Sequence, residues 1–297
     1  MNEKLQSLLD LLDLEPIERD IFRGDSHQSV VPRVFGGQVA AQALVAACRT
    51  VPRDRLPHSL HSYFLRPGDP GAPIVYLADR IRDGRSFTTR RVVAVQHGQP
   101  IFHLSASFQL AEEGMEHQAT MPPAPDPETL PTAEELIPRY RHLFAHPGIV
   151  ERLLEARAAV DLRYVAEPPI ATAGTGPREP RSQVWFRTNG KLQGEVDDPM
   201  VHICLATYVS DMTLLDSVLL AHGRGGWAAG DVVGASLDHA MWFHRPFRAD
   251  EWLLYDQESP TAQGGRGLAQ GRIYTRDGRL AVTVIQEGVI RVPRGQG

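Results

Sequence analysis

The sequence repeats itself with an offset of about 180 residues. Residues 61–67 (HSYFLRP) are similar to residues 240–246 (AMWFHRP), and Phe64 aligns with Phe243. Two pairs of turn segments follow at nearly the same offset: Asp83-Gly84-Arg85 with Gly264-Gly265-Arg266, and His97-Gly98-Gln99 with Asp277-Gly278-Arg279. Because chance rarely keeps such an offset over about 40 residues, the repeat predicts two copies of one folding unit.

Each copy is expected to contain a buried helix. Residues 36–48 (GGQVAAQALVAAC) are apolar on nearly every side, which is typical of a helix without an exposed face. In the second copy, apolar residues recur at helical spacing after Ser210-Asp211, and Gly223 is placed to end this helix in the left-handed conformation. The apolar residues are Met212, Leu214, Leu215, Val218 and Leu219.

Extended runs follow each predicted helix. Residues 73–110 contain three runs broken by glycine turns, and residues 252–292 repeat this pattern. The predicted fold class is therefore α+β, with an antiparallel sheet that wraps one buried helix in each copy. Two copies side by side would form one extended sheet with two helices on the same face.

A proline-rich segment separates the two copies. Prolines occur at five positions within residues 111–136, and such a segment cannot continue a sheet ladder. We expect an N-terminal unit at residues 1–110, an exposed linker at 111–136 and a C-terminal unit at 137–297. Residues 167–181, which also contain prolines and glycines, are expected to form a loop inside the second unit.

The composition is that of a folded globular protein and argues against several classes. The net charge is -5 and no Lys/Arg cluster occurs, so there is no electrostatic footprint for nucleic acid. No apolar run approaches the roughly 20 residues that span a bilayer, and neither end resembles a secretory or peroxisomal signal. Only two cysteines are present, in no paired motif, which indicates a reducing compartment, the cytoplasm.

Two polar side chains have unusual positions. Asp211 follows Ser210 at the expected start of the second helix, where it could cap the helix or act as an acid at the mouth of a pocket. Gln286 shares one face of its predicted strand with Val282 and Val284. A buried amide needs hydrogen-bond partners, so Gln286 is either a satisfied core amide or a functional group.

The signatures of a covalent nucleophile are missing from the sequence. Ser236 precedes a predicted strand, and neither it nor any other serine lies in a Gly-x-Ser-x-Gly motif. Cys48 lies inside the apolar helix and Cys204 inside an apolar run, which disfavours a nucleophilic cysteine.

Two further groups allow more than one interpretation. Asp238-His239 and His244 lack an additional carboxylate or cysteine ligand, so no metal site is expected. Gly36-Gly37 could bring backbone N–H groups to an anionic ligand or an oxyanion, or it could allow tight packing of the helix against the sheet.

Six segments carry a family resemblance: Phe35-Gly-Gly-Gln38, Leu60-His-Ser-Tyr-Phe-Leu-Arg-Pro-Gly-Asp69, Asp83-Gly-Arg-Ser-Phe87, Tyr208-Val-Ser-Asp211, Ser236-Leu-Asp-His-Ala-Met-Trp-Phe-His-Arg-Pro246 and Gln286-Glu-Gly288. In this order they resemble the acyl-CoA thioesterase II family of bacteria and peroxisomes, and they span nearly the whole chain. The resemblance implies a double hotdog fold, which agrees with the repeat. It also implies hydrolysis of fatty acyl-CoA to free fatty acid and CoA.

The resemblance further implies which residues act. Asp211, Ser236 and Gln286 match a triad of Asp, Thr or Ser, and Gln around a water molecule, and bacterial members often have Thr at the position of Ser236. Asp211 would deprotonate the water, while Ser236 and Gln286 would hold it. Gly36 and Gly37 are candidates for the backbone groups that stabilise the oxyanion.

The expected partner is the acyl-CoA substrate. Arg85, Arg90 and Arg91 are candidates for binding the CoA phosphates, although exposed charges on a sheet would explain them equally well. The implied reaction needs no cofactor and no metal, and a homo-oligomer, either a dimer or a tetramer, is expected. Two rival functions stay open: a hotdog enoyl-CoA hydratase that relies on Asp238-His239, and a non-catalytic acyl-CoA-binding protein.

Overall fold

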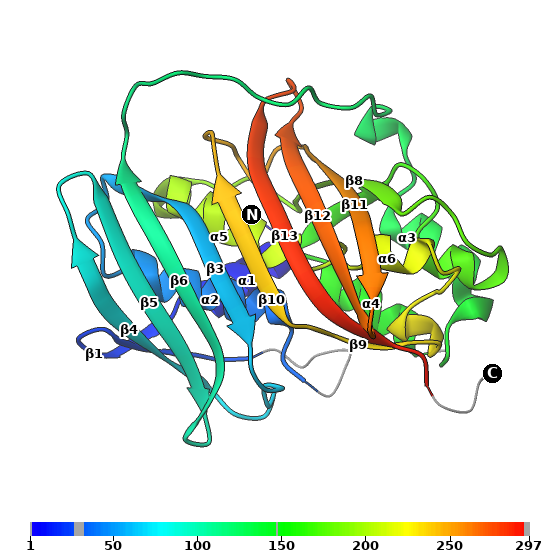
Figure 1. Cartoon of the computed structure of the whole chain (residues 1–297), viewed down its shortest axis with the longest axis horizontal. Coiled ribbons are helices and arrows are strands. Elements are labelled where there is room, and N and C mark those ends of the chain that lie inside the picture. Colours follow the sequence, from blue (N-terminus) through cyan, green and yellow to red (C-terminus); the bar gives the residue numbers. More distant parts are fainter. Residues whose placement is uncertain (1, 27–32, 147, 294–297) are drawn as a thin grey trace.

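One antiparallel sheet forms the frame of the molecule (Figure 1). The computed structural model describes residues 2–26, 33–146 and 148–293, and within them the sheet has 13 strands. The first copy contributes β1 (Glu15–Glu18), β2 (Ile21–Gly24), β3 (Arg55–Phe64), β4 (Ile74–Asp83), β5 (Phe87–Gln96) and β6 (Gln99–Leu110). The second contributes β7 (Val160–Tyr164), β8 (Arg181–Thr188), β9 (Val233–Ser236), β10 (Asp238–Phe243), β11 (Leu253–Gln263), β12 (Arg266–Thr275) and β13 (Leu280–Arg291).

The strand order is the one that two equal copies predict. The sheet runs β1-β2-β4-β5-β6-β3-β10-β13-β12-β11-β8-β7, and β9 pairs with β13. From its two edges inward, β2-β4-β5-β6-β3 therefore matches β8-β11-β12-β13-β10. The copies meet where β3 pairs with β10, and there Ala240 lies opposite His61, so the repeated segments themselves join the halves. The predicted α+β class and tandem arrangement are confirmed.

Two buried helices, α2 (Gly36–Cys48) and α5 (Pro199–Ser210), pack side by side on one face of the sheet (Figure 1). The alanines of α2 let the two backbones approach closely, while the fully buried Leu44 fills the space toward the sheet. The helix α5 begins with a proline, which costs no hydrogen bond because a backbone N–H at this position would have no partner within the helix. The Asp198 side chain caps the helix by accepting from the backbone N–H of Met200 at 2.8 Å.

Smaller helices surround this core. The amphipathic α1 (Glu3–Leu12) buries its leucines near α2 and α5. The others are α3 (Ala133–Leu136), α4 (Ile149–Arg157), α6 (Asp216–Leu220) and the 3-10 turns η1 (Pro127–Thr129), η2 (Ile137–Leu143), η3 (Pro169–Gly174), η4 (Gly194–Val196) and η5 (Trp227–Ala229). In the described parts of the chain, no helix is both long and apolar enough to cross a membrane.

The second helix does not lie where the sequence predicted it. The main helix α5 ends at Ser210, where the predicted helix begins, and Asp211 is its C-cap. Residues 199–210 are buried on almost every side, so no polar face marks their helical period. The prediction of a left-handed residue at Gly223 is confirmed, since its φ is +60° and its N–H donates to the carbonyl of Leu220 after α6.

The segment between the copies is held against the second copy. Residues 111–126 contain no helix or strand and cross toward α3 (Figure 1). On the face of the sheet opposite α5, Trp185 Nε1 donates to the carbonyl of Pro125 at 2.9 Å, and Trp252 Nε1 donates to Glu128 Oε1 at 2.9 Å. The predicted exposed linker is therefore wrong in part, because this segment covers aromatic side chains that would otherwise face solvent.

The core position of Leu44 gives a test of this packing. We expect Leu44→Ala to lower the free energy of unfolding by about 2–5 kcal/mol, because the surrounding alanines and strands cannot collapse into the cavity. Leu77→Ala is a matched control, since Leu77 is 39% exposed on β4, and should cost less than about 1 kcal/mol. Equal losses in urea unfolding would show that α2 is not part of the rigid core.

Candidate active site

Asp211 places a carboxylate of the second copy against the helix of the first. It lies at the N-terminus of α2, where the backbone N–H of Gly37 favours the ionised form of the carboxyl. The N-cap residue of α2, Phe35, forms no side-chain cap, and the carboxyl of the other copy lies beside the free N–H groups of the first turn. Gly36 leaves the room for this approach, because a Cβ there would lie 2.6 Å from Asp211 Oδ2. Asp211 thus meets the start of α2 and not of its own helix.

A hydroxyl and an amide converge on this carboxylate. Ser236 Oγ donates to Asp211 Oδ1 at 3.2 Å, and Gln286 Nε2 donates to the same oxygen at 2.5 Å. Gln286 Nε2 is also 2.8 Å from Ser236 Oγ. The three side chains that the family resemblance grouped are therefore in direct contact, although they come from the end of α5, the end of β9 and the middle of β13.

The strand register brings the amide to this place. Within β13, Gln286 points to the same buried side as Val282 and Val284, as the period of two predicted, and it is fully buried. The short strand β9 pairs with β13, with Ser236 opposite Gly288. The Ser236 hydroxyl at the end of β9 therefore reaches the amide of Gln286, which precedes Gly288 by two residues on β13.

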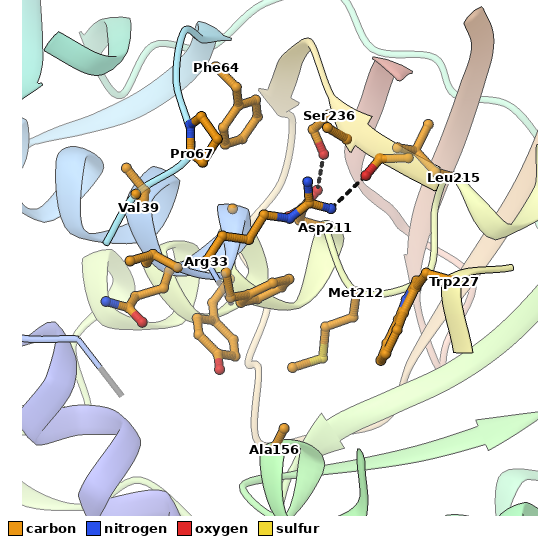
Figure 2. A pocket seen from close by; sticks show the side chains of 18 of the residues that line it. Arg33, Val39, Phe64, Pro67, Ala156, Asp211, Met212, Leu215, Trp227 and Ser236 are labelled. Carbon is orange, nitrogen blue, oxygen red and sulfur yellow. Dashed lines mark hydrogen bonds between the residues drawn. The ribbon is translucent and has the colours of Figure 1, made fainter. Parts of the chain in front are cut away.

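A cavity of about 1000 Å³ opens beside these groups (Figure 2). Asp211 and Ser236 line it, whereas Gln286 lies behind them. Much of its wall is apolar, formed by side chains that include Phe64, Leu153, Met212, Leu215, Leu219, Trp227 and Val232. Cationic side chains also reach it: Lys4, Arg33, Arg66, Arg152 and Arg157. The cavity can hold an apolar chain and an anionic group together.

Burial raises the pKa of the Asp211 carboxyl to about 6. Hydrogen bonds from Gln286 and Ser236 act in the opposite direction, as do the backbone N–H of Gly37 and the charge of Arg33. The carboxyl is therefore still ionised at neutral pH, and it is a stronger base than an ordinary aspartate.

Arg33 is a lining residue that sequence reasoning missed. Its Nη2 donates to the carbonyl of Gly234 at 2.6 Å, which holds the guanidinium beside Asp211 and Ser236 (Figure 2). A single arginine outside any helix or strand has no periodicity that could have indicated this role.

The three arginines considered for CoA do not line this cavity. Arg90 is fully buried, and its guanidinium donates to Thr50 and to backbone carbonyls and pairs with Asp83, so it has no N–H group left for a phosphate. Arg91 pairs with Asp79 on the exposed side of β5. Arg85 lies in the turn between β4 and β5 and is not part of the cavity wall.

The side chains of Asp238, His239 and His244 each have different surroundings and do not meet at one point. Asp238 Oδ1 accepts from the backbone N–H of Glu287 at 2.7 Å, His239 is buried on the helix side, and His244 Nε2 lies 2.8 Å from Thr283 Oγ1. Among the residues described, no group of three or more His, Cys, Asp or Glu side chains could hold a metal ion.

The two cysteines are poor nucleophiles in this fold. Both are buried, on the adjacent helices α2 and α5. Contact with the Cys204 thiol, followed by burial, holds the pKa of Cys48 well above its usual value. A thiolate is therefore not available at Cys48 near neutral pH.

The fold belongs to the double-hotdog class. A hot dog fold protein from Alicyclobacillus acidocaldarius superimposes with a TM-score of 0.75 at 20% identity, over 97% of this chain and 98% of that chain. A crystal structure of an acyl-CoA thioesterase II, TesB2, from Mycobacterium marinum is similar with a TM-score of 0.77 and 44% identity, over 98% and 99% of the two chains.

The sequence comparisons identify the family. Residues 154–289 match the model of the acyl-CoA thioesterase family, and residues 25–109 match that of the acyl-CoA thioesterase N-terminal domain. The chain is 45% identical to human acyl-coenzyme A thioesterase 8 over 95% of its length and 88% of the relative. It is 41% identical to acyl-CoA thioesterase 2 of Haemophilus influenzae over 98% of this chain and 99% of that relative. The chain therefore belongs to the acyl-CoA thioesterase family, whose members are thioester hydrolases.

The raised pKa of Asp211 predicts that this carboxylate lowers stability. The pKa in the folded protein exceeds the ordinary value, so the ionised form is disfavoured by folding, and stability falls as pH rises from about 4 to about 6. We expect Asp211→Asn to raise the free energy of unfolding by about 1–3 kcal/mol at pH 8, and by less at pH 4.5.

Urea unfolding of wild type and variant at both pH values measures this effect. Asp79→Asn is the control, because the exposed Asp79–Arg91 pair should change stability by less than about 1 kcal/mol at either pH. If Asp211→Asn is less stable than wild type at pH 8, burial does not disfavour the ionised form of Asp211 in the folded protein.

Proposed function

We propose that this enzyme hydrolyses fatty acyl-CoA to free fatty acid and CoA, with a water molecule activated by Asp211, Ser236 and Gln286. The observation that carries the proposal is the convergence of Ser236 Oγ and Gln286 Nε2 on one carboxylate oxygen in the wall of a cavity. The names of the relatives, acyl-CoA thioesterases from human to Haemophilus influenzae, supply the substrate class.

In the proposed reaction, Asp211 takes a proton from a water molecule beside it. The water oxygen forms a bond to the thioester carbonyl carbon, and the tetrahedral intermediate then breaks its C–S bond. The proton held by Asp211 passes to the departing CoA sulfur, which restores the carboxylate. A pKa of about 6 suits Asp211 to both steps near neutral pH.

The other two side chains have separate tasks. Ser236 lines the cavity and can hydrogen-bond the water directly. Gln286 does not line it, and its Nε2 bonds both Asp211 and Ser236, so we assign it the orientation of these two groups. This refines the role that the resemblance implies, in which Gln286 holds the water itself.

The N-terminus of α2 is the proposed oxyanion site. Its first-turn N–H groups have no intrahelical acceptors and carry partial positive charge. The N–H of Gly37 interacts with the Asp211 carboxyl and favours its ionised form, so we prefer Gly36 of the pair. The glycines also permit the close approach of α2 to Asp211 and to Tyr208, which supports the packing interpretation as well.

The substrate is proposed to occupy the whole cavity. The apolar wall around Met212, Leu219 and Trp227 would take the acyl chain. Among the cationic lining residues, Arg33 and Arg66 are better candidates for the CoA phosphates than Arg85, Arg90 and Arg91, because they face this cavity.

The rival functions receive less support. An enoyl-CoA hydratase would use Asp238-His239, but Asp238 accepts from a backbone N–H while His239 is buried on the other side of β10. A non-catalytic acyl-CoA-binding protein would have no use for a buried carboxylate of raised pKa held by two donors. The cytoplasmic location and the homo-oligomer, a dimer or a tetramer, remain expectations from the sequence.

Release of free thiol from a panel of saturated acyl-CoAs tests the function. We expect Asp211→Asn to lower kcat by about 10²–10⁴-fold, because the general base is lost. Ser236→Ala and Gln286→Ala should each lower kcat by about 10–100-fold through misplaced water. Leu77→Ala, far from the cavity, should retain full activity. No thiol release from any chain length would refute the proposal, and unchanged turnover in a variant would remove that residue from the mechanism.

The pH dependence tests the role of the base independently. Only the ionised form of Asp211 can accept a proton, so kcat/KM should fall as the pH drops below about 6 and reach a plateau above it. In Asp211→Asn, the residual rate should lack this acidic limb. A profile that is flat between pH 5 and 8 in the wild type would exclude Asp211 as the base.

A further inference from the structure

The amide of Gln286 has a hydrogen-bond partner at its nitrogen but none at its oxygen. Its Nε2 donates to Asp211 and lies 2.8 Å from Ser236 Oγ, whereas its Oε1 is buried without a hydrogen-bond partner. An amide that flips by 180° would turn Oε1 toward the Asp211 carboxylate and place two acceptors against each other. The Asp211 contact thus selects the orientation of the amide, and the buried Oε1 needs a donor of its own.

His239 is a buried donor in the right position. The side chain is 1% exposed, and its Nδ1 is also buried without a hydrogen-bond partner. The ladder between β10 and β13 pairs Ala240 with Ile285, so His239 and Gln286 follow as the next positions on the buried side. Two unsatisfied groups, one able to donate and one able to accept, thus lie next to each other.

The first copy supports this pairing. By the repeat offset, Leu60 corresponds to His239 and Ala106 to Gln286. Leu60 and Ala106 lie directly opposite each other across β3 and β6, and both are buried. The same cross-strand pair is therefore apolar in the copy without a triad and polar in the copy that has one. The two polar side chains occur together, which indicates a joint role.

The position of the ring proton of His239 depends on where Ser210 directs its single hydroxyl proton. Burial lowers the pKa of His239 to about 4, while its interaction with Gln286 raises it, so the imidazole is neutral near pH 7. Its Nε2 is 2.8 Å from Ser210 Oγ, and the carbonyl oxygen of Thr207 is a second acceptor for the same hydroxyl at 2.9 Å. When the Ser210 hydroxyl donates to Nε2, the proton of the ring must reside on Nδ1, which faces the amide. Ser210 immediately precedes Asp211, so this chain returns to the catalytic carboxylate.

We propose that His239 is a positioning residue for the hydrolysis, which holds the Gln286 amide through an Nδ1–H to Oε1 hydrogen bond with Ser210 as the partner of Nε2. The chain Ser210–His239–Gln286 keeps Nε2 of the amide directed at Asp211 and Ser236. This inference rests on the proposed role of Gln286 and adds two residues to it.

A double-mutant cycle on the full-length enzyme tests the proposal. His239→Phe should lower kcat by about 10–100-fold with KM within about twofold of wild type, because the substrate still binds but the amide loses its fixed orientation. In the Gln286→Ala background, the same substitution should change kcat by less than about threefold, since the amide is already gone.

Conservative variants identify the nitrogen that acts. Asn at position 239 carries a side-chain N–H about as far along the chain as Nδ1, whereas Gln carries it near the position of Nε2. His239→Asn should therefore retain most of the activity and His239→Gln should not. Leu60→Met, a volume-conserving change at the position of the first copy that corresponds to His239, is the control and should keep kcat within about twofold.

The outcomes separate the two proposals. Equal losses from His239→Phe in both backgrounds, or no loss at all, would overturn the positioning role. Equal activity of His239→Asn and His239→Gln would overturn it too, even if His239→Phe does not fold. If Gln286→Ala itself is fully active, the proposed function of the triad fails, and the positioning role fails with it.

Discussion

The contact between the Asp211 carboxylate and the N-terminus of α2 ties the two copies and the active site together. A helix start needs an acceptor for its free N–H groups, and α2 has none from its own N-cap. The second copy supplies it, which requires glycine at position 36 and draws a carboxylate into a buried environment. The same burial that costs stability raises the pKa of Asp211 toward neutrality and makes it a useful base.

The duplicated architecture allows the two copies to contribute different parts of one site. Both copies build a helix on a sheet, but they differ in which polar groups they direct inward. The second copy places His239 and Gln286 where the first has Leu60 and Ala106. One copy therefore contributes the helix start and the other the side chains that we propose to react. Duplication followed by divergence of buried positions allows this division, because the packing frame is retained while its polar contents change.

Much of the site could be anticipated from sequence, but for different reasons at different residues. The placement of Gln286 beside valines followed from strand periodicity, which is a local property. The grouping of Asp211, Ser236 and Gln286 came from family resemblance and not from spacing. Arg90 was one of the candidates for a phosphate ligand, because the sequence does not reveal that this charged side chain is fully buried and hydrogen-bonded. Likewise, the helix α5 escaped prediction because an apolar run on all sides has no readable period.

The sequence by itself determined the tandem fold, since a constant repeat offset and matching turn segments can be read directly from the order of the amino acids. Only the tertiary structure decided that Asp211 lies at the start of α2 instead of its own helix, that Arg33 joins the cavity, and that His239 lies behind Gln286. Each of these depends on contacts between segments far apart in the chain. Such contacts are set by how helices and strands pack, which no local pattern in the sequence encodes.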